Sequence, residues 1–62
     1  MNELLTRMSV TLDALRTELY YAENSGDAAW AATARGQYDE TAARFRVELD
    51  AASAALLERL AT

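Results

Sequence analysis

The sequence has no cysteine, histidine or proline, and its six basic residues are all arginine. Histidine, cysteine and lysine act as the base or the nucleophile in most acid–base and covalent catalysis, and none of them is present. Carboxylate metal sites in helical proteins usually add histidine to their glutamates, and the ligand pattern of a calcium-binding loop is absent as well. We therefore expect a protein that is not an enzyme, with no catalytic residue, no cofactor and no metal ion.

Large apolar residues are also scarce, since the 62 residues include 9 Leu, 2 Val and 1 Phe but no Ile. A chain this short hides a smaller share of its surface than a larger domain, so its own core is expected to be marginal. Alanine occurs 14 times and is the best helix former. The composition predicts one all-α domain over residues 1–62, with a thin core lined by alanine, that binds itself or a larger protein.

Two further absences concern location and partners. The sequence has no run of 18 apolar residues that could span a bilayer, and its first residues lack the basic start and apolar stretch of a signal peptide. We therefore expect a cytoplasmic protein that has no contact with a membrane. The net charge is −4 and no basic stripe is visible, so nucleic acid is not an expected partner.

The clearest pattern is a row of six apolar residues at alternating spacings of three and four, which lie on one side of a helix. They are Leu5, Met8, Leu12, Leu15, Leu19 and Ala22. Next, Gly26 can take the left-handed conformation that ends a helix, and Asp27 can accept the free N–H groups of a new one. The pattern predicts a helix over about residues 2–24 and a turn at 24–27.

A second row with the same spacing predicts a longer helix over about residues 28–61. Its members are Tyr38, Ala42, Phe45, Leu49, Ala52 and Leu56. A glycine inside a helix costs only about 1 kcal/mol relative to alanine, so one helix with at most a kink at Gly36 is favoured over a break. The expected fold is an antiparallel helical hairpin that assembles into a four-helix or larger bundle.

The two arms of this hairpin are unequal, so the last dozen residues would project roughly 18 Å beyond the first helix. An apolar stripe there is unfavourable in water and should be covered by another chain. The residues expected to bind that partner are Leu49, Ala52, Leu56, Leu57 and Leu60. A weaker apolar row of Ala43, Val47, Ala54, Leu57 and Ala61 is either a set of isolated surface residues or a second packing face.

Three aromatic residues, Tyr20, Tyr21 and Trp30, lie close to the turn and also count as candidate partner-binding residues. One interpretation is that Trp30 caps the hairpin against Ala22 and a tyrosine. The other is an interaction hot spot, because buried Trp and Tyr dominate binding energies. The charges form helix-stabilising pairs four residues apart, such as Arg35 with Asp39.

We favour a small protein–protein interaction module, an adaptor or structural subunit that self-associates through apolar helix faces. One alternative is an acidic accessory protein of the kind that phages encode, which inhibits a host factor or joins a virion. Its acidic residues would gather on one face, whereas here they are distributed among arginines. In outline, a dimer of helical hairpins also resembles the small RNA-binding plasmid regulators, which implies RNA binding as a third possibility, although their basic surface is not visible here.

Overall fold

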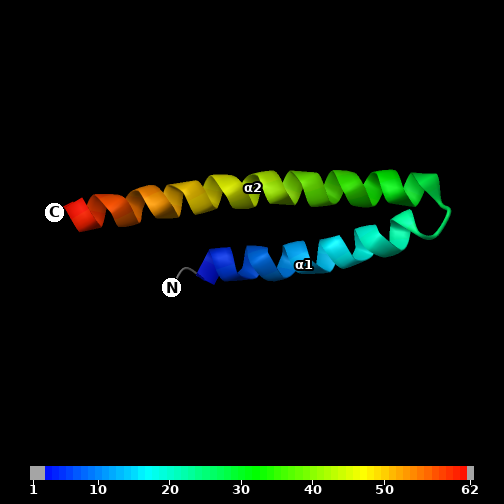
Figure 1. Ribbon diagram of the computed structural model, residues 1–62, viewed down its shortest axis with the longest axis horizontal. Coiled ribbons are helices and arrows are strands. Elements are labelled where there is room, and N and C mark those ends of the chain that lie inside the picture. The colour runs from blue at the N-terminus through cyan, green and yellow to red at the C-terminus, as the bar shows by residue number, and fades with distance from the viewer. Residues whose placement is uncertain (1–2, 62) are drawn as a thin grey trace.

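The computed structural model describes residues 3–61, which form two α-helices, α1 (Glu3–Glu23) and α2 (Ala28–Ala61). A short turn joins the helices, and they lie side by side as an all-α helical hairpin (Figure 1). The molecule is a thin rod measuring 54 × 15 × 12 Å. Both helices begin and end within one residue of the bounds expected from the sequence, and α2 continues through Gly36 without a break.

The turn has the two helix caps that the sequence predicts. Gly26 has a φ of 83°, the left-handed conformation that glycine adopts at little cost. The side chain of Asp27 accepts a hydrogen bond from the backbone N–H of Trp30 at 3.0 Å, as an N-cap residue does. The Ser25 hydroxyl donates to the carbonyl of Ala22 at 2.6 Å and accepts from the N–H of Asp27 at 3.0 Å. These bonds fix where α1 ends and α2 begins.

One stripe of α1 faces α2, and it consists of the six residues whose spacing predicts it. Leu12, Leu19 and Ala22 are buried, Leu5, Met8 and Leu15 are half-buried, and every other described residue of α1 is exposed. The heptad prediction for α1 is therefore confirmed.

The facing stripe of α2 starts about two helical turns earlier than predicted. Ala34 is buried and Ala31 half-buried, ahead of the predicted Tyr38, Ala42, Phe45 and Ala52, which are all half-buried. Leu19, Ala22 and Ala34 form the core, with Ala31 and Tyr38 packed against them. The core thus lies at the loop end of the hairpin. Helix separation depends on the size of the side chains between the axes, and the two helices converge toward this alanine-lined end (Figure 1).

At the other end, α2 continues past the beginning of α1 and projects from the hairpin (Figure 1). Residues 53–61 are all exposed, because no described part of α1 lies beside them. Leu49 and Leu56 belong to the predicted stripe, but they are 44% and 50% exposed. The hairpin therefore covers only the first part of the α2 stripe.

Candidate functional site

The main candidate site is the apolar surface on the projecting part of α2, here called the C-terminal apolar face, and its members are Leu49, Ala52, Leu56, Leu57 and Leu60. Leu57 and Leu60 are 66% and 74% exposed, more than Leu49 and Leu56. With 3.6 residues per turn, Leu49, Ala52, Leu56 and Leu60 continue the stripe that α1 covers nearer the loop. Leu57 lies about 100° around the helix from Leu56. Four of the five predicted residues therefore share one stripe, and Leu57 lies beside it.

The unequal helix lengths leave this face uncovered. α1 has 21 residues and α2 has 34, a difference that corresponds to about 20 Å of helix. The stripe stays apolar along that extra length, whereas the side of a helix that faces water normally carries polar residues. The sequence therefore specifies an apolar face that the described hairpin itself does not bury.

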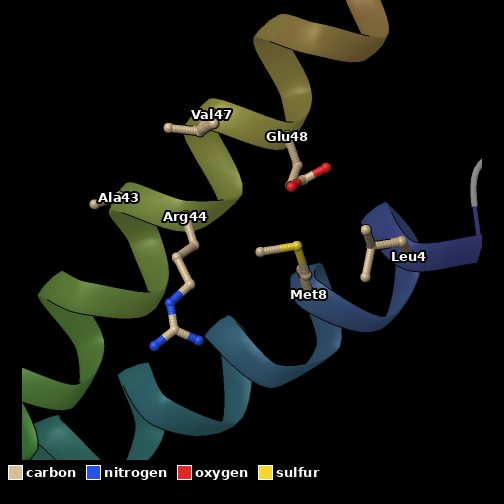
Figure 2. Close-up of a pocket in the computed structure, with 6 residues that line it drawn as sticks. All are labelled: Leu4, Met8, Ala43, Arg44, Val47 and Glu48. Carbon is tan, nitrogen blue, oxygen red and sulfur yellow. The ribbon is translucent and has the colours of Figure 1, made fainter.

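An open pocket of about 520 Å³ lies between the helices near the beginning of α1. It is lined by Leu4, Met8, Ala43, Arg44, Val47 and Glu48, and Figure 2 shows that Met8 points toward α2 while Ala43 and Val47 point away from α1. Arg44 bonds Glu40 at 2.7 Å, and this pair has the spacing of four residues that is typical of helix-stabilising ion pairs. The pocket is an apolar depression with a charged rim, next to the level at which α2 begins to project.

The aromatic residues near the loop do not form one cluster. The indole N–H of Trp30 donates to the Glu18 carboxylate at 3.1 Å, and Trp30 is 39% exposed. The rings of Tyr20 and Tyr21 lie edge to face, with centroids 5.5 Å apart, and both side chains are well exposed. Glu18 and Tyr20 are about 200° apart around α1, so Trp30 and Tyr20 lie on opposite flanks of the hairpin.

This arrangement bears on the two interpretations of Trp30. Its polar contact crosses from α2 to α1, so the side chain helps to join the helices, while much of its ring stays accessible to water. The tyrosine pair lies beside residues 31–32 of α2, about 45 Å along the rod from the tip of α2 at the rise of one helical residue. The C-terminal apolar face and the aromatic residues are therefore two separate surfaces.

On the opposite flank, an ion pair that the sequence did not reveal also joins the helices. Arg35 bonds Glu23 at 2.7 Å, with both side chains about half exposed. The hydrogen bond to Glu23, together with the charge of that carboxylate, raises the pKa of Arg35 above its ordinary value. Asp39, the partner predicted from spacing, contributes a weaker attraction of the same sign. The two cross-helix contacts, from Glu18 and Glu23, fix the rotation of α1 against α2 near the loop.

The polar groups of the hairpin have structural roles that their contacts make visible. The hydroxyls of Thr11 and Thr17 donate hydrogen bonds to backbone carbonyls one turn earlier in α1. The Ser25 hydroxyl donates to a backbone carbonyl within the turn. Within residues 3–61, no three acidic side chains gather closely enough to hold a metal ion together. Neither described helix combines the length and the apolar character needed to cross a membrane.

The chain has no significant match among protein-family models, curated proteins or solved structures.

Proposed function

We propose that this protein is a small, non-enzymatic protein–protein interaction module that self-associates through the C-terminal apolar face into an assembly of four or more helices. The observation that carries the proposal is the run of exposed leucines on the part of α2 that α1 does not reach. Only four residues of the described hairpin are buried, which is a small core for an independent domain. In this proposal, association between copies of the chain buries the apolar surface that the single hairpin leaves exposed.

The size of the exposed face is suited to a reversible assembly. The exposed fractions of Leu49, Leu56, Leu57 and Leu60 add up to about two whole leucines, and their burial is worth roughly 3–7 kcal/mol per chain. Two chains gain twice that amount, which is comparable with the roughly 4–15 kcal/mol that association costs in lost freedom. We therefore expect a dimer that dissociates on dilution, with the rest of the hairpin surface available to other partners.

The substitution Leu56→Asp tests the proposal. It removes a half-exposed leucine from the centre of the face and places a charge in the interface, twice per dimer. We expect the dissociation constant to rise at least about 100-fold, equivalent to roughly 3 kcal/mol per dimer. Light scattering across a concentration series, with circular dichroism on the same samples, measures the mass and the helix content together.

Val10→Asp is the matched control, because Val10 is 65% exposed on the part of α1 that faces away from α2. It should leave the mass unchanged. An unchanged mass for Leu56→Asp as well, or a wild-type chain that stays monomeric at every concentration, would contradict self-association through this face. The same series at low and high salt distinguishes an apolar interface, which tolerates salt, from binding driven by the acidic surface, which weakens.

A further inference from the structure

We propose that the C-terminal apolar face binds the same face of a second copy in antiparallel orientation, with the two Leu56 side chains meeting at the two-fold axis. This inference rests on the proposed self-association and adds to it the direction and the register of the paired helices. Four properties of the described hairpin support it: the area it exposes, the order of large and small residues on the face, the length of the projecting helix, and the opposite charges of the helix ends that meet.

The chain exposes more surface than a compact protein of its size. The chain exposes 4892 Å². A compact protein of 6.8 kDa is expected to expose about 4,000 Å², so this chain carries an excess of about 900 Å². A standard protein–protein interface buries about 800 Å² on each partner. Pairing with one second copy along the projecting part of α2 buries part of this excess, which includes the exposed leucines of the C-terminal apolar face.

The face is complementary to itself when it is reversed. Ala52 and Leu60 lie four residues before and four residues after Leu56. In an antiparallel pair centred on Leu56, Leu60 of each copy faces Ala52 of the other, so that a large side chain meets a small one on both sides of the axis. In a parallel pair, leucine would face leucine and alanine would face alanine, which leaves a gap at Ala52. Packing therefore favours the antiparallel direction.

The length of the projecting segment sets the register. Leu4 shares a pocket with Glu48, so α1 begins near the level of Glu48. With Leu56 on the axis, Ala61 of the second copy lies level with Ala51. The α2 helix of the second copy thus ends about where α1 begins, and the two helices together cover the whole apolar stripe of α2.

The helix ends that meet at this junction have opposite electrostatic character. The carboxyl end of a helix carries a partial negative charge and the amino end a partial positive charge, so the end of one α2 attracts the start of the other copy's α1. The side chains follow the same rule, since Arg59 lies in the last turn of α2 and Glu3 in the first turn of α1. Both features favour end-to-end contact between the copies.

The first test uses the unaltered chain. Two rods of 54 Å that overlap along their projecting segments form a particle about 90 Å long. A dimer whose hairpins lie side by side keeps a length close to that of one hairpin. Small-angle X-ray scattering at a concentration where light scattering gives a dimer measures the maximum dimension. A dimer about 90 Å long supports the overlap, and a dimer of about 55–60 Å overturns it.

The second test reads the register with single cysteines, which the natural chain lacks. The variants Ala52→Cys and Leu60→Cys, mixed and oxidised, should form a disulfide between the two different chains, because residues 52 and 60 face each other. Neither variant alone should link to itself, since like positions lie about 12 Å apart along the axis. Ala32→Cys, at an exposed position near the loop, measures the background of random collisions.

The outcomes separate this inference from the proposed function. Linkage of the 52 and 60 variants with each other, and not with themselves, supports the antiparallel register. Self-linkage at position 60, or a dimer in which the 52 and 60 variants link no more than Ala32→Cys, overturns the register and leaves self-association intact. A chain that remains monomeric under all conditions overturns both proposals.

Discussion

The substitution Ala34→Leu probes the close approach of the two helices at the loop end. Ala34 is 1% exposed and lies in the core with Leu19 and Ala22, so three added carbon atoms have no space without moving α1 away from α2. Overpacking of a well-packed core typically costs about 1–3 kcal/mol. In a domain of this size each 1 kcal/mol lowers the melting temperature by about 4–8 °C. We therefore expect Ala34→Leu to melt about 4–24 °C below the natural chain.

Circular dichroism during heating measures the effect, at one fixed protein concentration because association also contributes to stability. Ala32→Leu is the control, since Ala32 is exposed on the same helix and should tolerate leucine with little change. The double variant Leu19→Ala with Ala34→Leu keeps the core volume and should recover part of the loss. If Ala34→Leu melted at or above the temperature of the natural chain, the helices would not be in close contact at this point.

Two further predictions concern the turn and the middle of α2. Gly26→Ala should destabilise the hairpin by about 1 kcal/mol because φ is 83° there, whereas Gly36→Ala should stabilise it by about 0.5–1 kcal/mol, since Gly36 is helical with open space around it. Thermal melts of both variants at one concentration check the opposite signs, and a loss at Gly36 would contradict an unbroken α2. Asp27→Ala should cost about 1 kcal/mol by removing the N-cap bond to Trp30, while Asp27→Asn retains an acceptor and should cost little. Equal losses for the two variants at position 27 in urea titrations would show that the cap does not act through its acceptor.

Much of the hairpin could be predicted because its signals are local. Leucines at spacings of three and four leave little choice about which side of α1 is buried, and Gly26 and Asp27 have separate physical reasons to end one helix and begin the next. These features depend on neighbours in the sequence, so their prediction does not require knowledge of how the helices meet.

The features that were missed depend on how α1 and α2 pack against each other. Ala34 is a core residue and Ala31 packs against the core, but alanine is so frequent in this chain that a buried alanine has no distinct signal. The spacing of four and three residues counted back from Tyr38 was the only available indication. The bond between Arg35 and Glu23 was missed because spacing on one helix pointed to Asp39. Which side chains form a pair between two helices depends on how far each helix is rotated about its own axis. The sequence pattern defines that rotation only to within tens of degrees.

The projecting end of α2 also bears on the lifetime of the chain. Residues 53–61 are all exposed at the end of α2, and the end of a helix that has little tertiary packing opens readily in water. We expect the amide protons of this segment to exchange quickly in a monomer and its backbone to open often enough for proteases to cut it. Burial against a second copy would protect the same bonds. A cell would then degrade unassembled copies faster than assembled ones, and turnover would follow the concentration of the protein.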